Sequence, residues 1–290
     1  MSILDGTTLR LALPKGRMQQ GVVALLEEAG ISVRLSDRGY RPNVNLPNTT
    51  TKILKPQNII EMLHLGSRDV GFAGADWVSE LEAKLVLLCD TGLDPVQIVA
   101  AAPKALLVDG ALPTRRIVVA SEYERLTRSW IADSGLDATF VRSYGATEVF
   151  PPEDADCIVD NTATGSTLRE NGLTIVGELL RSSTRLYANP RSLDVPEKRA
   201  TIEGLVLVVN SVLEARKRVM LELNVSAEAL AHVIEALPCM REPTISPLSG
   251  GAAFAVKAAV PRDALPTLIP KLKARGGTDI VVSKLTQIVA

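Results

Sequence analysis

Short apolar strands alternate with helical segments along the first part of the chain, and this alternation constrains the fold more than any other feature. Residues 9–13 and 31–35 predict strands on either side of a helix at 22–29. A helix that begins at Pro56 precedes a further predicted strand at 69–74. Strands and helices at this spacing indicate βαβ units and a mostly parallel sheet. Such sheets bind ligands at the carboxyl ends of their strands.

The same alternation continues after a predicted strand at 96–102, which could cross to a second lobe. Residues 116–120 and 138–142 predict strands around another helix. Strands at 173–179 and 185–187 could return the chain to the first lobe. We therefore expect two α/β lobes joined by crossing strands, with a ligand cleft between the lobes.

The C-terminal part follows a different pattern. Strands at 218–224, 244–248, 253–260 and 280–289, with two helices between them, give the order βαββαβ of a ferredoxin-like domain. No catalytic cluster appears there, so a structural or oligomerising module remains open. The expected division is a first lobe of residues 1–95 and 180–215, a second lobe of 96–179, and a C-terminal domain of 216–290.

Two loops at the expected carboxyl ends of strands carry functional groups. Lys15-Gly16-Arg17 forms a turn with two cations, and the segment 71–76 forms a tight turn that ends in Asp76. Asp76 could also cap a helix that begins at Trp77. Exposed charges and a plain helix cap explain these residues as well as a ligand would.

A third loop follows the apolar strand at 157–159. Asp160 stands where this strand should end, and a hydroxyl-rich loop, 162–167, leads into a helical turn. Unpaired N–H groups and the dipole of a helix start favour anions, and Gly165 allows close approach of the backbone. No Lys or Arg occurs from Asp160 to Thr167, so neutral dipoles would hold a phosphate while Asp160 accepts hydrogen bonds from sugar hydroxyls. A capped turn without a ligand is the alternative.

Composition excludes several classes of function. The chain has 290 residues, a formal net charge of −1 and only 3% aromatic residues, which argues against binding to nucleic acid or to an anionic membrane. Three cysteines far apart in the sequence fit reduced thiols and a cytoplasmic location. With only two histidines and no HExxH pattern, a histidine-based zinc site is not expected. No segment approaches the roughly 20 apolar residues needed to span a bilayer.

Residues Val159-Asp160-Asn161-Thr162-Ala163-Thr164-Gly165-Ser166-Thr167-Leu168 resemble the phosphoribosyl pyrophosphate motif of the ATP phosphoribosyltransferase family. Glu148, the pair Ala155-Asp156 and the segment 171–173 extend the match. Segments 11–17, 55–56 and 71–76 resemble the family's other signatures in the same order. The C-terminal domain resembles the regulatory domain of the family's long form.

The resemblance implies a pentosyltransferase that joins N1 of ATP to 5-phosphoribosyl 1-pyrophosphate in the first step of histidine biosynthesis. It implies a two-lobed catalytic part like the type II periplasmic binding proteins, followed by a ferredoxin-like, ACT-like regulatory domain. An adenine nitrogen is the nucleophile, so no Ser, Cys or His nucleophile is needed. Mg²⁺ is the expected cofactor, because it would neutralise the leaving pyrophosphate.

The resemblance also implies roles for residues. The groups expected to act in catalysis are Lys15, Arg17, Lys55 and Glu148. Phosphoribosyl pyrophosphate is expected to meet Asp156, Asp160, Asn161, Thr162, Ala163, Thr164, Gly165, Ser166 and Thr167. ATP is expected to meet Lys15, Gly16, Arg17, Gly74 and Asp76.

Feedback by L-histidine is expected at the C-terminal domain, through Thr244, Ser246 and Leu248. Family members often have Ser where this chain has Glu242. The long form further implies dimers or hexamers of this chain and no separate regulatory subunit, such as the histidyl-tRNA-synthetase-like partner of the short forms.

Two rival functions share parts of this pattern. A non-catalytic solute-binding protein would have the same two lobes, but it is disfavoured by the hydroxyl-rich loop. A regulatory sensor could bind an amino acid in its ferredoxin-like module while its lobes only assemble.

Overall fold

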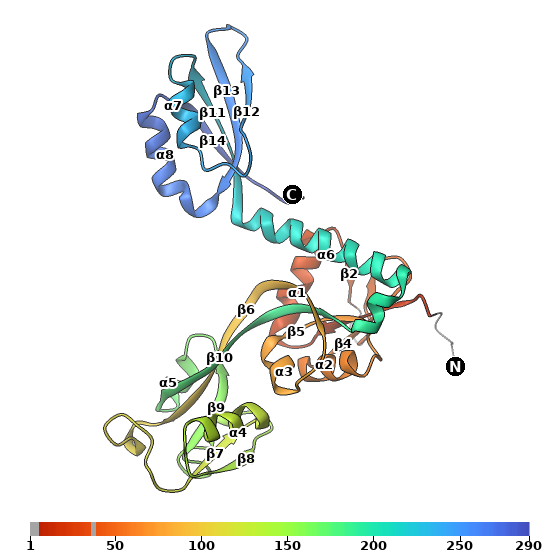
Figure 1. Cartoon of the computed structure of the whole chain (residues 1–290), viewed down its shortest axis with the longest axis vertical. Coiled ribbons are helices and arrows are strands. Elements are labelled where there is room, and N and C mark those ends of the chain that lie inside the picture. Colours follow the sequence, from red (N-terminus) through yellow and green to blue (C-terminus); the bar gives the residue numbers. More distant parts are fainter. Residues whose placement is uncertain (1–5, 36–38, 290) are drawn as a thin grey trace. The chain divides into compact units, whose positions relative to one another are not determined.

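The computed structural model describes residues 6–35 and 39–289 (Figure 1). They divide into two compact units. The first holds the described residues up to Ala24 together with Ile31–Glu203, and the second holds Leu25–Gly30 and the chain from Gly204 onward. None of the described helices is both long and apolar enough to cross a membrane.

The first unit is built on one eight-stranded sheet in the order β4-β1-β5-β10-β6-β9-β7-β8. Its strands are β1 (Leu9–Pro14), β4 (Thr49–Leu54), β5 (Val70–Gly74), β6 (Val86–Pro103), β7 (Ile117–Ser121), β8 (Ala138–Arg142), β9 (Cys157–Thr162) and β10 (Leu173–Ala188). A separate small sheet pairs β2 (Val33–Arg34) with β3 (Asn43–Val44).

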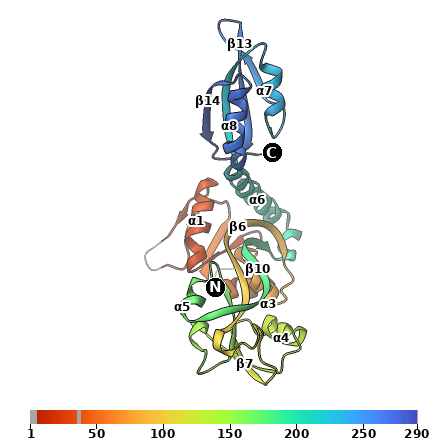
Figure 2. The same cartoon turned by 90° about the vertical axis from the view of Figure 1, so that its left-hand side faces the viewer.

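Two parallel groups of strands lie at the ends of the large sheet. β1 runs parallel to β4 and β5, and β7 runs parallel to β8 and β9. Between them, the long strands β6 and β10 are antiparallel partners, side by side in both views (Figures 1 and 2). β10 pairs with β5 through residues 184–188, and β6 pairs with β9 through residues 97–101. Each long strand therefore belongs to both lobes, which confirms the expected α/β lobes joined by crossing strands.

The expectation of two separate return strands at 173–179 and 185–187 was wrong, because β10 is continuous from Leu173 to Ala188. The polar run 181–184 interrupts the apolar pattern without ending the strand. Within that run, the side chains of Ser182 and Thr184 are buried and hydrogen-bonded to Asp76 and Asp94. Local hydropathy could not reveal these distant partners.

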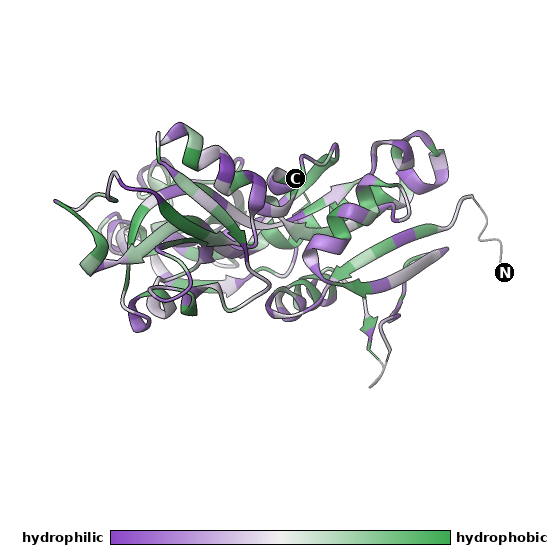
Figure 3. Cartoon of the chain, turned by 90° about the horizontal axis from the view of Figure 1, so that it is seen from below, coloured by the Kyte–Doolittle hydropathy of each residue, from purple (hydrophilic) through white to green (hydrophobic). Residues whose placement is uncertain are grey.

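Helices cover both groups of strands. They are α2 (Pro56–His64), α3 (Ala75–Glu80), α4 (Glu124–Asp133) and α5 (Ser166–Glu170). Two further helices, α1 (Arg17–Glu28) and α6 (Pro196–Lys217), have residues in both units. Pro56 occupies the first turn of α2, as predicted, and Ile59, Ile60 and Leu63 of α2 pack with Ala12 and Ala73 of the sheet. The helices alternate hydrophilic and hydrophobic residues along their lengths (Figure 3), which is the pattern of half-buried helices.

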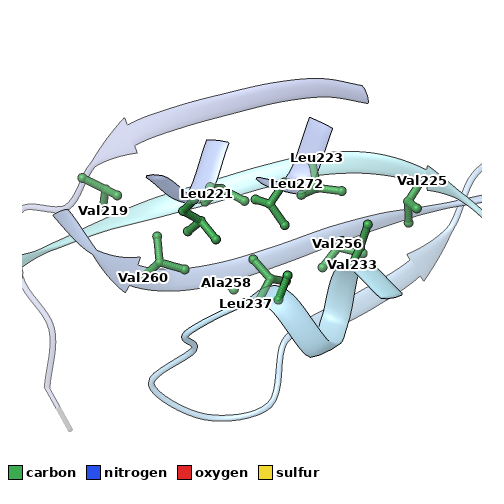
Figure 4. Packing of buried hydrophobic residues seen from close by; sticks show 12 residues of the cluster. Val219, Leu221, Leu223, Val225, Val233, Leu237, Val256, Ala258, Val260 and Leu272 are labelled. Carbon is green, nitrogen blue, oxygen red and sulfur yellow. The ribbon is translucent and has the colours of Figure 1, made fainter. Parts of the chain in front are cut away.

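The second unit contains β11 (Arg218–Ser226), α7 (Leu230–Ala236), β12 (Thr244–Pro247), β13 (Ala253–Pro261), α8 (Leu265–Ala274) and β14 (Thr278–Lys284). Its sheet order, β12-β13-β11-β14, confirms the βαββαβ ferredoxin-like pattern. Alternate residues of β11 and β13 form a core with Val233 and Leu272 from the two helices (Figure 4). The last strand ends at Lys284, earlier than predicted, and the backbone N–H of Ile288 bonds instead to the carbonyl of Ser211.

Candidate active site

A cavity of about 280 Å³ opens between the lobes, at the carboxyl ends of the parallel strands. Its lining from the first lobe is Lys15, Arg17, Met18, Pro56, Gly74, Asp76 and Trp77. The second lobe and the long strands add Tyr123, Asn161, Asp94, Val96, Ser182, Ser183 and Thr184. The first-lobe residues meet because β1, β4 and β5 are parallel and adjacent, so the segments that follow them emerge at one edge of the sheet.

Lys15 and Arg17 give the first-lobe wall a positive charge. Both side chains are exposed, and Gly16 between them adopts a left-handed φ of +85° that turns the chain from β1 into α1. The ammonium of Lys15 donates to the hydroxyl of Tyr40 at 3.0 Å and lies 4.9 Å from the centre of its ring. Lys55 is also exposed and directly precedes Pro56 of the cavity wall, but neither Lys55 nor Gly16 lines the cavity.

Asp76 is not the helix cap that its position suggested. α3 begins one residue earlier, at Ala75, and no side chain caps it. The buried carboxylate instead accepts hydrogen bonds from the Ser182 hydroxyl at 2.6 Å and from the Tyr123 hydroxyl at 2.8 Å. Burial, and then Asp76, raise the pKa of Tyr123, so its phenol keeps the proton that it donates. Asp76 thereby ties the first lobe to the second lobe and to β10.

Tyr123 and the serines of β10 are site residues that sequence reasoning missed. Tyr123 stacks on Trp77 with ring centres 4.7 Å apart, and its hydroxyl also lies 3.4 Å from the amide nitrogen of Asn161. Tyr123 follows β7 just as the hydroxyl-rich loop follows the parallel strand β9. This shared position after parallel strands was the sequence signal that could have identified Tyr123 as a site residue.

The hydroxyl-rich loop forms, but it starts later than predicted, because β9 continues through Asp160 and Asn161 to Thr162. The hydroxyl of Thr162 accepts a hydrogen bond from the backbone N–H of Gly165 at 2.9 Å. The hydroxyls of Thr164 and Ser166 lie 3.0 Å apart. Gly165 has a left-handed φ of +71° and is followed directly by α5. Ala163 and Thr167 are exposed on the same loop.

A cation from outside the loop lies against it and adds to the neutral dipoles that were expected to hold most of a phosphate's charge. Arg169 donates from Nη1 to the carbonyl of Thr164 at 3.0 Å. A Cβ atom added at Gly165 would lie 3.0 Å from the same nitrogen. Arg169 stands four residues after Gly165 on α5, and helical side chains lean toward the N-terminus, so this position could have been found from the sequence.

Asp160 lies on β9 near other acids, directly before the cavity residue Asn161, but does not itself line the cavity. The pKa of its carboxyl group is raised to about 6, first by burial and then by Glu148 and Glu122, against the lowering effect of the backbone N–H of Asn161, which donates at 2.6 Å. Glu148 is half-buried on the turn Thr147–Val149, after β8. The two predicted acids Asp160 and Glu148 are therefore electrostatic neighbours.

Asp156 does not join this group. It precedes β9, whereas the loop follows the strand, so the two lie roughly 20 Å apart along an extended chain. Its carboxylate accepts from Arg115 at 2.7 Å and from the backbone N–H of Val118 at 2.8 Å. Burial alone would raise the pKa of Asp156, but these hydrogen bonds outweigh it and lower the pKa. The structure therefore assigns Asp156 to anchoring β7, and its expected contact with the ribose is not supported.

No ready-made metal site appears among residues 6–35 and 39–289, because no three His, Cys, Asp or Glu side chains converge there. Mg²⁺ in nucleotide-handling sites commonly uses only one or two carboxylates together with substrate phosphates and water. Glu148 and Asp160 meet that lesser requirement.

Comparison with known proteins decides the family. A family model described as ATP phosphoribosyltransferase matches residues 55–211, and one described as the HisG C-terminal domain matches residues 215–287. The chain belongs to the ATP phosphoribosyltransferase family. The ATP phosphoribosyltransferase of Pelotomaculum thermopropionicum is 34% identical over 97% of this chain and 99% of that relative. The ATP phosphoribosyltransferase of Chlorobaculum parvum is 33% identical over 98% of this chain and 99% of its own length.

A solved structure of another ATP phosphoribosyltransferase shares the fold. The ATP phosphoribosyl transferase (HisG:HisZ) complex from Thermotoga maritima matches with a TM-score of 0.61 and 26% identity. The match covers 98% of that chain but only 70% of this one. This ATP phosphoribosyltransferase chain is therefore longer than that chain.

Proposed function

We propose that this chain condenses ATP with 5-phosphoribosyl 1-pyrophosphate to give N1-(5-phosphoribosyl)-ATP and pyrophosphate, the first step of histidine biosynthesis. The observation that carries the proposal is one cavity with two cations on its first-lobe wall and, on its second-lobe wall, the residue that precedes the hydroxyl-rich loop. Lys15 and Arg17 stand on one wall, and Asn161 on the other leads directly into the hydroxyl-rich loop. Membership in the ATP phosphoribosyltransferase family supplies the reaction that this arrangement supports.

The reaction needs positioning and charge stabilisation more than a protein nucleophile. N1 of the adenine forms a bond to C1 of the ribose while the C1–O bond to pyrophosphate breaks, and the leaving group takes that electron pair. We assign the 5-phosphate to the loop 162–167 and the ribose hydroxyls to Asp160. Lys15 and Arg17, with Lys55 nearby, would meet pyrophosphate or the ATP phosphates, because cations there stabilise the departing charge.

Asp76 takes a positioning role in this proposal. Both of its carboxylate oxygens already accept hydrogen bonds, from Ser182 and Tyr123. It holds the buried Tyr123, whose ring stacks on the partly exposed Trp77, so that Trp77 can offer an apolar surface to a purine at the cavity wall. Gly74 lies directly before α3, and because it has no side chain, its backbone can form part of that wall.

A divalent ion fits the donor set as a companion of pyrophosphate. Glu148 and Asp160 are the carboxylates that would contact it, and Mg²⁺ would neutralise the leaving group's charge. Lys15, Arg17 and the loop 162–167 would bind and orient the two polyanions beside that ion.

The deciding experiment measures product formation from ATP and phosphoribosyl pyrophosphate by ultraviolet absorbance. Turnover by the full chain is expected, and Lys15→Met should lower kcat/KM about tenfold or more, because a hydrogen bond to a charged group is lost. Lys104→Met, an exposed lysine outside the cavity, is the matched control. Tight binding of either substrate without any turnover would favour the solute-binding or sensor alternatives.

We also propose that L-histidine regulates the enzyme through its C-terminal unit. A cavity of about 360 Å³ there is lined by Thr244 together with Arg241, Glu242 and Lys257. These charges could pair with the carboxylate and amino groups of an amino acid. Ser246 and Leu248 do not line that cavity, so Thr244 is the strongest of the three candidates.

The proposed assembly consists of copies of this chain, as dimers or hexamers. Because the chain carries its own HisG C-terminal domain, we propose that it needs no separate regulatory subunit of the kind named in the Thermotoga maritima complex. A cytoplasmic location is part of the same proposal, since its widely spaced cysteines suit a reducing compartment.

A further inference from the structure

A group of cations lies in the first lobe, away from the cavity. Arg68 lies two residues before β5, Lys52 lies in the edge strand β4, and Arg41 lies between β2 and β3. Lys52 pairs with Ala12 of β1, which packs against α2, so Lys52 is on the face of the sheet that α2 covers. We call Arg41, Lys52 and Arg68 the cation cluster.

The nearby acid is already used by other partners. Asp69 accepts hydrogen bonds from Arg10 at 2.8 and 2.9 Å, from Ser192 at 2.8 Å and from Lys198 at 3.0 Å. Two cations, Arg10 and Lys198, thus neutralise this single carboxylate. Among the described residues, no acid forms an ion pair with Arg41, Lys52 or Arg68.

Arg68 shows an unmet need for an acceptor. Its Nη1 is buried and has no hydrogen-bond partner, one of only two such side-chain atoms in the described part of the chain. Burial and then Arg10 lower the pKa of the guanidinium, Asp69 opposes them without cancelling them, and Arg41 lowers the pKa further. Arg68 in turn is the main cause that lowers the pKa of Lys52. Like charges that face one another around a buried donor raise the free energy of the folded protein until an anion joins them.

We propose that the cation cluster is a binding site for a phosphate-type oxyanion. Water could satisfy the hydrogen bond of Arg68 but would leave its charge uncompensated. A phosphate accepts in several directions at once, which suits the guanidinium fork of Arg68 before β5 and the ammonium of Lys52 on β4, two strands separated by β1.

The site is separate from the cavity between the lobes. Arg68 lies before the amino end of β5, whereas Gly74 at the other end lines that cavity. The strand's 5 residues span about 16 Å. One phosphate therefore cannot contact both places.

The test is calorimetric titration of the full chain with inorganic phosphate at low ionic strength. Lys15→Met, which weakens phosphate binding in the cavity between the lobes, should still show one phosphate-binding event, at the cation cluster. Arg68→Met should weaken that event about tenfold or more, since a charge-assisted hydrogen bond is lost. Lys52→Met should weaken it in the same direction, and Lys104→Met is the control.

Unfolding in urea gives a second readout that does not depend on enzyme activity. Phosphate should raise the unfolding midpoint of Lys15→Met, in which binding in the cavity between the lobes is reduced, but not that of the double variant Lys15→Met/Arg68→Met, because a ligand stabilises only a state that binds it. Should Arg68→Met fail to fold, Lys52→Met carries the same comparison. Equal phosphate binding by Arg68→Met, Lys52→Met and wild type would overturn the proposal, as would loss of all binding in Lys15→Met alone.

Discussion

At the scale of single residues, Gly165 has the most specific requirement for its backbone. Its φ of +71° suits glycine, and a Cβ there would press on Nη1 of Arg169. Gly165→Leu should therefore weaken binding of phosphoribosyl pyrophosphate about tenfold or more. The left-handed backbone would be strained by about 1–2 kcal/mol, and the new side chain would displace Arg169 from the loop. Calorimetry measures the affinity.

Gly172→Leu is the matched control for that variant. Gly172 has nearly the same φ, +70°, at the other end of α5, and a Cβ there meets nothing within 4 Å. Gly172→Leu should lose a similar amount of unfolding free energy but should keep its affinity for phosphoribosyl pyrophosphate. An equal loss of affinity in both variants would show that strain around α5, and not the loop itself, controls binding.

Asp160 should give the enzyme a measurable dependence on pH. Its folded-state pKa of about 6 exceeds the ordinary value of 3.8, so the folded protein keeps this proton to higher pH than the unfolded chain does. The free energy of unfolding should therefore fall as pH rises from about 4 to 6. Asp160→Asn should not show that fall, and its free energy of unfolding at pH 8 should exceed that of the wild type by about 1–3 kcal/mol.

Urea unfolding of both proteins across this pH range is the measurement. The difference between them should vanish below about pH 4, where the wild-type carboxyl is protonated in both states. The same variant should bind phosphoribosyl pyrophosphate more weakly at pH 8, since an amide is a poorer acceptor for ribose hydroxyls. Parallel pH profiles for the two proteins would contradict the assignment.

At the scale of elements, Asp69 connects β1, β5 and α6 within the first unit. Burial alone would raise the pKa of Asp69, but hydrogen bonds from Arg10, Lys198 and Ser192 outweigh it and lower the pKa to about 2. Asp69→Asn should cost roughly 3–5 kcal/mol of unfolding free energy, because it leaves buried cations unpaired. The stability that Asp69 contributes in the wild type should be lost as pH falls from about 4 to 2.

Urea unfolding measures the loss in Asp69→Asn, and Asp156→Asn, measured in the same way, is the comparison. Its partner Arg115 is 57% exposed, whereas Lys198 beside Asp69 is 8% exposed, so water screens the Asp156 pair far more. A loss in Asp156→Asn as large as that in Asp69→Asn would show that burial does not set the strength of these pairs.

The sequence predicted those elements whose signals are local. Pro56 marked the start of α2, and alternation of apolar residues marked β1 and the ferredoxin-like strands. Contacts between distant residues stayed hidden. Asp76 looked like a cap because its partners lie 47 and 106 residues away, at Tyr123 and Ser182.

For the candidate site, too, the sequence predicted the parts whose signals are local. Cations after β1 and the loop after β9 follow from motifs that are continuous in sequence, and both lie at the expected strand ends. Asp156 was grouped with the loop because motif proximity says nothing about which end of a strand a residue occupies, and its contact with the ribose stays a prediction. Arg115, which holds it, comes from a different strand connection.

At the scale of the whole molecule, the C-terminal unit should make the reaction sensitive to histidine. L-Histidine is expected to inhibit the full chain, and a chain that ends at Lys217 should turn over without that inhibition. Thr244→Val, which removes one polar group from the cavity in that unit, should raise the inhibition constant several-fold, about the effect of one lost hydrogen bond. Steady-state assays with increasing histidine measure both effects.

Thr174→Val, an exposed threonine of β10, is the control for that substitution. Inhibition that persists unchanged in the truncated chain would place the effector site elsewhere. Turnover that is lost on truncation, with the fold retained, would show that the C-terminal unit supports catalysis directly.

The double crossing of β6 and β10 limits how this protein can be divided by engineering. Each strand supplies backbone partners to both lobes, so excising either lobe would leave half-strands with unsatisfied N–H and C=O groups. Swapping one lobe with that of a relative would require matching the irregular register between the pair, which shifts at several places. Chimaeras should therefore be joined outside these two segments, with the catalytic part transferred whole.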